Sequence, residues 1–274
     1  MRFADILMAS AQRSGGTVTL DAATVAWAAA VVTAGGTVSS VRKNIVNTFI
    51  VNEKVAGNWD LTDDYWGLWG ESATQALVSL KQLRAATVTA APTFTADAGY
   101  TFNGTSQFVN TGFVPSTHCV AASGTNQRVA VYERTNVTGG TYSIGAFTSG
   151  TASFRLCARN GTNIASSLNS GLANINLPAA DSRGFTATSR ASGGTSMLGF
   201  KNGGQRPTAS GLTVGTALVA QAIYIGAYNN SGSAAGFRAA SIGLAALGAP
   251  LSVDQETLQY ANVQQWATAI GAQV

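Results

Sequence analysis

The spacing of apolar residues changes once along this chain, within residues 91–115, and that change constrains the fold more than any other feature. Before this segment, apolar residues recur at intervals of three and four, which is typical of amphipathic helices. Within and after it, short apolar runs are separated by Asn-Gly, Thr-Gly and Gly-Gly steps, which is typical of short strands joined by tight turns. No helical pattern separates these strands, so the sequence predicts a mainly β antiparallel sandwich and not parallel β-α-β units.

Strands are expected at several places after residue 115. Alternation of apolar and polar residues is clearest at 154–158 and 183–188, while Gly-rich or Asn-rich turns fall at the joints, as at 229–232. The predicted strands are 127–133, 141–147, 153–158, 183–190, 196–201, 218–228 and 237–247.

The helical part of the pattern lies mainly before residue 90. Asp21 is placed to cap a helix that runs to residue 34, and Thr37 is placed to cap a second helix that ends at Gly57. Capping boxes predict a third helix from Ser72 to about Leu83 and a C-terminal helix that begins after Ser252. Residues 1–20 are irregular and are interpreted as an arm.

Composition narrows the class of protein. With 46% hydrophobic and only 10% charged residues, the chain is folded, and a surface so poor in charge favours coverage by other copies or other proteins. The net charge of +4 is spread over single cations apart from Arg42-Lys43, so nucleic-acid binding is not expected. We expect no signal peptide and no membrane insertion, and therefore reduced, buried Cys119 and Cys157 in a chain made in the cytoplasm.

Three tryptophans, Trp59, Trp66 and Trp69, lie within twelve residues of each other. Tryptophan faces pack well on pyranose rings, so this group is a possible sugar platform. The favoured interpretation is that these rings join short helices to the sandwich, because large aromatic side chains dominate the energetics of small cores.

Catalytic side chains are scarce. A glycosidase needs two carboxylates on either side of the bond that it cleaves, yet no predicted strand carries two acids, and only a distant pair such as Glu133 with Asp181 is left. The single histidine, His118, stands beside Cys119, which supplies too few zinc ligands. We therefore expect no enzyme, no metal site and no cofactor.

The segment 92–113, P-T-F-T-A-D-A-G-Y-T-F-N-G-T-S-Q-F-V-N-T-G-F, resembles the entry strands of concanavalin A-like (laminin G-like) jelly rolls. Together with W-A-A-A-V-V-T-A-G-G-T-V-S (27–39), N-W-D-L-T-D-D-Y-W-G-L-W (58–69) and S-V-D-Q-E-T-L-Q-Y-A-N-V-Q-Q-W (252–266), it resembles a family of tailed-bacteriophage virion proteins. These proteins join a small helical N-terminal region to such a sandwich. The resemblance implies an arm at 1–20, a helical assembly or anchoring region at 21–90, and a sandwich with its C-terminal helix at 91–274.

The function implied by the resemblance is that of a non-enzymatic structural protein on the surface of a phage particle. It would be a head decoration or spike protein, or a tail fibre or baseplate component, with other virion proteins and further copies of itself as partners. Host-surface polysaccharide is an expected ligand, and Tyr228, Asn229 and Asn230 are the candidate contacts, unless they only form a hairpin turn. The alternatives are a carbohydrate-binding adhesin and a polysaccharide depolymerase.

Overall fold

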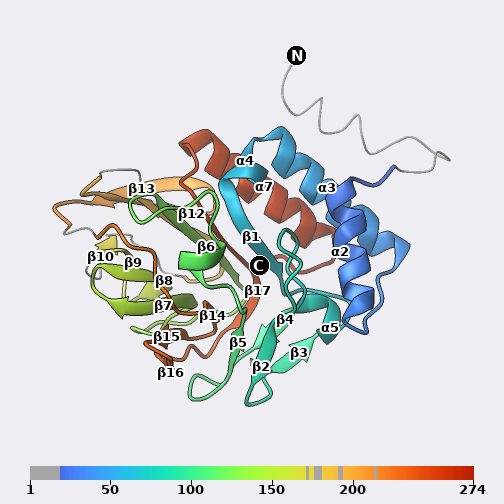
Figure 1. The fold of residues 1–274 in the computed structure, drawn as a ribbon, viewed down its shortest axis with the longest axis horizontal. Helices are drawn as coiled ribbons and strands as arrows, with labels where there is room; N and C mark the ends of the chain where they lie inside the picture. Colours follow the sequence, from blue (N-terminus) through green and yellow to red (C-terminus); the bar gives the residue numbers. More distant parts are fainter. Residues whose placement is uncertain (1–18, 171–172, 176–180, 191–193, 213–214) are drawn as a thin grey trace.

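The computed structural model describes residues 19–170, 173–175, 181–190, 194–212 and 215–274. Two β-sheets pack face to face, and helices cover the outer face of one of them (Figure 1). The predicted fold class is confirmed, because a mainly β sandwich has a small helical region before it and a helix after it. Residues 1–18 of the predicted arm lie outside the described residues.

The sheet that the helices cover is antiparallel throughout its described pairs and is called the helix-covered sheet. Its strand order is β13 (Gly204–Ala209), β12 (Met197–Lys201), β11 (Gly184–Arg190), β6 (Gln127–Glu133), β17 (Ser241–Gly248), β4 (Gly99–Thr101) and β3 (Thr93–Thr95), with β1 (Thr62–Gly67) also paired to β17. Strands β1 and β17 come from opposite ends of the chain and lie side by side (Figure 1).

The other sheet is called the second sheet. Its strand order is β10 (Ala173–Ile175), β9 (Asn163–Leu168), β8 (Ala152–Asn160), β7 (Ile144–Ser149), β14 (Tyr224–Ile225), β5 (Phe108–Asn110) and β2 (Thr87–Thr89). A hairpin of β15 (Tyr228–Asn230) and β16 (Ser233–Ala235) joins it, with β15 parallel to β7.

The central strand β6 is buried along its whole length because both of its faces are covered. Val129 and Val131 point into the hydrophobic core between the two sheets, whereas Ala130 and Tyr132 point into the core beneath the helices. Successive side chains of a strand alternate between faces, so this single run serves both cores. The helical layer and the sandwich therefore share one packed structure around the helix-covered sheet.

The helices are α2 (Ala22–Thr33), α3 (Ser40–Val55), α4 (Asn58–Leu61), α5 (Ala73–Ala76), α6 (Pro115–His118) and α7 (Val253–Ala269). The Asp21 cap is confirmed, since its side chain accepts from the backbone N–H of Ala23. The Ser252–Gln255 capping box is confirmed in both of its hydrogen bonds. The second cap was wrong by two residues: Ser39, and not Thr37, accepts from the N–H of Arg42.

Four other local predictions were wrong. The third helix has only four residues, because the chain after α5 turns so that the N–H of Leu80 bonds to the carbonyl of Tyr65. Residues 62–67, expected in the helical region, form β1. Of the strand expected over 218–228, only Tyr224, Ile225 and Tyr228 lie in strands, and Gly226 between them has a left-handed φ of +84°. Strands β9 and β13 were missed.

The three clustered tryptophans are buried, with 7% exposure at Trp59 and none at Trp66 and Trp69. Trp66 packs between the sheets and the other two pack beneath the helices. This confirms the structural interpretation and rules out Trp66 and Trp69 as a sugar platform. Cys119 and Cys157 are free, as predicted, but only Cys157 is buried, and the prediction of a buried Cys119 was wrong because it is half-buried. No helix in the described part of the chain is long and apolar enough to cross a membrane.

Candidate functional site

Six aromatic side chains gather on the outer face of the second sheet. Strand alternation puts Phe108, Phe147 and Tyr224 there, because their neighbours Val109, Ala146 and Ile225 point into the core between the sheets. The six are Phe108, Tyr142, Phe147, Tyr224, Tyr228 and Phe237, and together they are called the aromatic surface. Tyr142 and Tyr224 are almost buried, at 8% and 9% exposure, and the other four are half-buried.

The aromatic surface has two groups in ring contact. Phe108 stacks on Tyr224 at 4.4 Å between ring centroids, with Phe237 6.3 Å from Phe108. Tyr228 meets the ring of Tyr142 edge-on at 4.7 Å and that of Phe147 at 6.3 Å. These spacings are those of favourable edge-to-face and offset pairs, so each group is a pre-formed platform.

Gly236 lies between the two groups, next to Phe237 in the chain. A Cβ at this position would come within 2.7 Å of the Tyr142 ring and 2.9 Å of the Tyr228 ring. The φ of Gly236 is +58°, which a side chain disfavours as well. Glycine is therefore required here for the chain to pass close beneath the two tyrosines.

Arg155 is the charged residue at the centre of the second group. Its guanidinium carbon lies 4.2 Å from the ring centroid of Phe147 and 5.0 Å from those of Tyr142 and Tyr228. These three rings form what we call the aromatic box of Arg155. A guanidinium within about 6 Å of ring centroids is attracted to the negative ring faces.

The position of Arg155 follows from strand geometry. On β8, Phe154 and Leu156 point into the core, so Arg155 between them points outward. Its cross-strand partner on β7 is Gly145, where a Cβ would lie 2.7 Å from Cγ of Arg155. The missing side chain of Gly145 lets the arginine lie across β7 and reach the hairpin of β15.

The predicted contact residues Tyr228, Asn229 and Asn230 form strand β15 beside this box, and they have different surroundings. Tyr228 is part of the aromatic box. Asn229 is 3% exposed, and its amide holds the hairpin, with Oδ1 accepting from the N–H of Gly232 at 2.8 Å and Nδ2 donating to the carbonyl of Ala222 at 3.1 Å. Asn230 is exposed. Asn229 is therefore a positioning residue for the hairpin.

Sequence reasoning missed Arg155, Phe147 and Tyr142 as site residues. One signal was present, since the alternation at 154–158 places Arg155 on the face opposite Phe154. The contact of Arg155 with Tyr142 and Tyr228 had no such signal, because it depends on the pairing of β7 with both β8 and β15.

Next to the aromatic box, Cys157 occupies the same face of β8. Its thiol donates to the carbonyl of Gly139 at 3.3 Å, and burial raises its pKa to about 11. A thiol with a raised pKa carries little thiolate at neutral pH, so this cysteine is a packing group and a poor nucleophile.

The two carboxylates considered for a catalytic pair do not meet. Glu133 is fully buried and forms an ion pair with Arg238, whose Nη2 donates to Oε2 at 2.9 Å. Asp181 forms a separate ion pair with Arg183, which holds the pKa of Asp181 below its usual value through hydrogen bonding. Among the described residues, no group of three or more His, Cys, Asp or Glu side chains could hold a metal ion.

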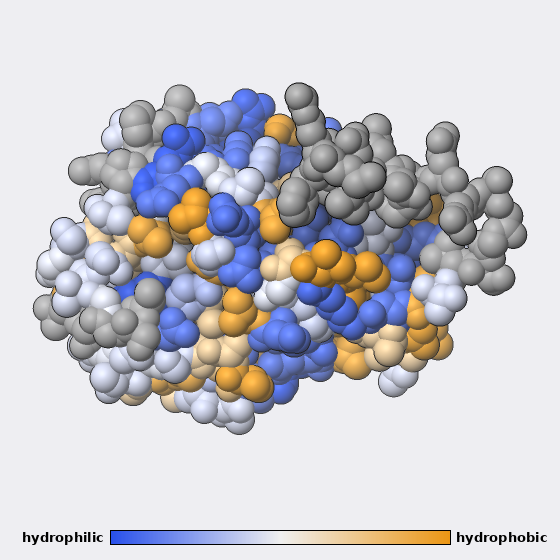
Figure 2. Space-filling view, turned by 90° about the horizontal axis from the view of Figure 1, so that it is seen from above, coloured by the Kyte–Doolittle hydropathy of each residue, from blue (hydrophilic) through white to orange (hydrophobic). Residues whose placement is uncertain are grey.

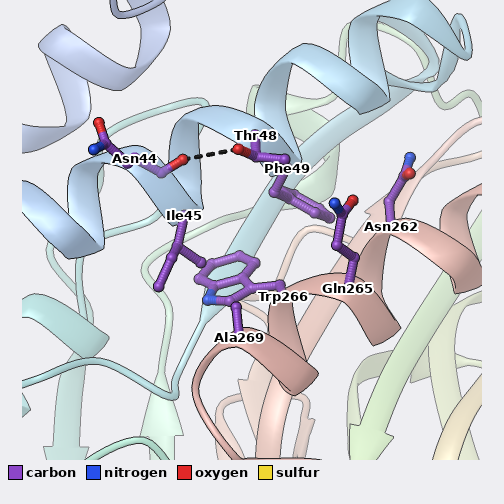
Figure 3. A pocket seen from close by; sticks show the side chains of 8 residues that line it. All are labelled: Asn44, Ile45, Thr48, Phe49, Asn262, Gln265, Trp266 and Ala269. Atoms are coloured by element: carbon purple, nitrogen blue, oxygen red, sulfur yellow. Dashed lines mark hydrogen bonds between the residues drawn. The ribbon is translucent and has the colours of Figure 1, made fainter. Parts of the chain in front are cut away.

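A groove of about 200 Å³ lies between α3 and α7 (Figure 3). Trp266 and Phe49 line it together with polar side chains, and Thr48 donates back to the carbonyl of Asn44 at 3.0 Å. Asn262 donates to Glu53 at 2.7 Å. Two of the polar groups that line this groove thus bond within the helical layer, which makes it a weaker candidate than the aromatic surface.

No protein family model matches the chain, and no curated protein matches it. Among solved structures, the botulinum neurotoxin serotype D binding domain has a TM-score of 0.50 at 10% identity, covering 74% of this chain and 52% of that chain. Domain 4 of AbnA, an extracellular arabinanase from Geobacillus stearothermophilus in complex with arabinotriose, has a TM-score of 0.48 at 11% identity, covering 72% and 97%. At these identities the likeness to the toxin domain concerns the β-sandwich fold alone.

Proposed function

We propose that this protein is a non-enzymatic, carbohydrate-binding component on the surface of a bacteriophage particle, and that it binds host-surface polysaccharide through the aromatic surface. One observation carries the proposal. Six aromatic side chains gather on the outer face of the second sheet, and four of them are half-buried and so reach solvent. Scattered single apolar residues are ordinary on a protein surface, whereas aromatic side chains gathered in groups on one face favour a binding site.

The chemistry of the aromatic surface suits sugars. The faces of Phe147, Tyr228 and Phe108 offer flat apolar area for the C–H face of a pyranose ring, and the exposed amide of Asn230 offers donors and an acceptor for hydroxyl groups. Stable ring pairs hold these faces in place before a ligand arrives, which lowers the entropy cost of binding.

The placement in a phage particle is supported by the motif resemblance and by the surface of the helical layer. Five exposed valines lie on α2 and α3: Val25, Val32, Val41, Val51 and Val55. On the face at the top of Figure 1, hydrophobic residues stand in separate groups among hydrophilic ones (Figure 2). We propose that the helical layer anchors the protein to other virion proteins and to copies of itself, while the second sheet faces outward.

Sedimentation with surface polysaccharide from candidate host cells tests the binding proposal. Saturable depletion of the free protein is expected, with competition by soluble polysaccharide. Phe147→Ala and Tyr228→Ala should each raise the Kd by about fivefold to tenfold, since each removes a stacking face. Tyr260→Ala on α7 is the matched control, because it removes a half-buried tyrosine from the other side of the sandwich. No depletion at high micromolar protein would refute the proposal.

Light scattering tests the anchoring role. We expect a homo-oligomer whose mass falls to that of a monomer when residues 1–20 are deleted or when Val25→Ser and Val32→Ser are combined. A monomer that is indifferent to these changes would contradict it. Release of reducing ends from polysaccharide by the purified chain would favour the depolymerase alternative instead.

A further inference from the structure

The buried arginines of this protein divide by the partners of their guanidinium groups. Arg128 and Arg238 are fully buried and bond to the carboxylates of Glu256 and Glu133. Arg42 is paired with Asp97, and Arg190 donates to the carbonyls of Leu168 and Gly124, each at 2.6 Å. Arg155 differs from all of these. Within the described residues its side chain forms no hydrogen bond and no ion pair, and its guanidinium lies against three aromatic rings.

Arg155 is 8% exposed, and its Nε is buried without a partner. Among the described residues the two Nη nitrogens have no hydrogen-bond partner either, and they are not among the buried unpartnered atoms, which leaves them in contact with solvent. A buried cation costs free energy unless an anion or acceptors replace its water. The three rings supply part of this replacement, but they accept few of the five N–H groups that a guanidinium donates.

We propose that the polysaccharide bound at the aromatic surface is acidic, with the carboxylate of a uronic-acid type sugar held by the Nη nitrogens of Arg155. This inference rests on the proposed function and specifies the class of ligand. A carboxylate matches the planar fork of a guanidinium with two parallel hydrogen bonds. The ring of the same sugar then lies against Tyr228 or Phe147, whose faces border the guanidinium.

The charge around Arg155 favours an anion. The strands of the second sheet contain two cations, Arg155 and Arg159, and no Asp or Glu. From residue 99 to residue 253 the chain has nine Arg or Lys residues and only two acids. Those two acids, Glu133 and Asp181, are already paired with Arg238 and Arg183. Among the described residues, no carboxylate forms an ion pair with Arg155.

The experiment measures binding of the full chain to two matched pairs of polymers at about 0.15 M salt. The first pair is polygalacturonate and its methyl ester, and the second is hyaluronate and its carboxyl-reduced form. Each pair keeps the sugar backbone and replaces the charged carboxylate by a neutral group. The expected result is at least about tenfold tighter binding to the acidic member of one or both pairs, which corresponds to one bidentate charged contact.

Substitutions test whether Arg155 causes the preference for acidic polymers. Arg155→Gln should remove it, and Arg155→Lys should retain only part of it, because an ammonium cannot form the two-bonded fork. Arg206→Gln, which removes an exposed cation from β13 of the helix-covered sheet, should leave the preference unchanged. Because the wild-type chain is itself compared on matched polymers, the proposal stays testable even if a variant fails to fold.

The outcomes separate the two proposals. Equal binding to acidic and neutral members would overturn the acidic ligand and leave polysaccharide binding intact. A preference that survives Arg155→Gln but disappears with Arg206→Gln would overturn the assignment to Arg155. No binding to any of the four polymers or to host polysaccharide would overturn both proposals.

Discussion

The two outer faces of this sandwich each bury an arginine, and they treat it in opposite ways. Arg128 projects from β6 of the helix-covered sheet and donates to Glu256 on α7 through Nε and Nη2, each at 2.7 Å. Arg155 projects from β8 of the second sheet into a box of three rings without a carboxylate. A helix that covers a face can bring an anion to its cation, whereas the cation on the other face has only aromatic rings around it.

The covered arginine belongs to a closed network. Glu53 on α3 accepts from Tyr65 at 2.7 Å, from Gln259 at 2.8 Å and from Asn262 at 2.7 Å, and Gln259 in turn accepts from Arg128. Side chains of α3, β1 and α7 thus bond to one another beneath the helices. The comparison teaches that the buried cation beneath the helices is paired with a carboxylate, although its Nη1 has no partner, whereas the cation on the second sheet has only rings around it.

The largest expected effect comes from breaking the covered pair. Glu256→Leu should lower the free energy of unfolding by about 3–5 kcal/mol, because it leaves the guanidinium of Arg128 buried without its anion. The double variant Arg128→Met with Glu256→Leu should recover much of this loss, since it removes both charges. Urea unfolding of the three proteins measures both. If Glu256→Leu were as stable as the wild type, Arg128 would not depend on its carboxylate, and the contrast with Arg155 would be wrong.

The buried carboxyl group of Asp64 on β1, in the helix-covered sheet, predicts that stability depends on pH. Burial raises the pKa of Asp64 to about 6, above the value of about 3.9 in an unfolded chain. Between about pH 4 and pH 6 the folded protein therefore binds a proton that the unfolded chain has lost, and stability falls as the pH rises, by about 2–3 kcal/mol in total. Above pH 6 this cost is fully present.

Asp64→Asn should remove that pH dependence and stabilise the protein at pH 7. Its amide oxygen keeps the acceptor that bonds the N–H groups of Tyr65, Lys81 and Gln82. Thermal unfolding of both proteins from pH 4 to pH 7 provides the measurement. Parallel curves over that range would show that Asp64 does not titrate as described.

A smaller change acts on the second sheet. Gly145→Ala should cost about 1–3 kcal/mol, because the new Cβ would lie 2.6 Å from the carbonyl oxygen of Phe154 and 2.7 Å from Cγ of Arg155. It should also displace Arg155 from its box and reduce the preference for acidic polymers. Unfolding by urea and the paired-polymer assay test the two effects. Unchanged binding would show that the box does not position the arginine.

The smallest effects separate two neighbouring asparagines. Asn229→Ala should cost about 1–2 kcal/mol because it removes two hydrogen bonds that hold the β15–β16 hairpin. Asn230→Ala should change stability by less than about 0.5 kcal/mol, since its side chain is exposed. Equal losses of stability in the two variants would contradict this division of roles.

Local sequence signals determined the fold class and several elements of this protein. The cap at Asp21, the capping box at Ser252 and the bounds of β6 were all predictable, because each depends on residues within a few positions of one another. The assignment of 62–67 to a strand was not predictable, because it depends on pairing with β17 at the other end of the chain.

The candidate site shows the same division. Tyr228 and the turn after it were visible in the sequence, and so was the outward direction of Arg155 on an alternating strand. Only the tertiary structure brought Arg155 against Tyr142 and Tyr228, and only it left that guanidinium without an ion pair among the described residues. Local pattern sets which face a side chain takes, but its neighbours on that face are set by which strands pair.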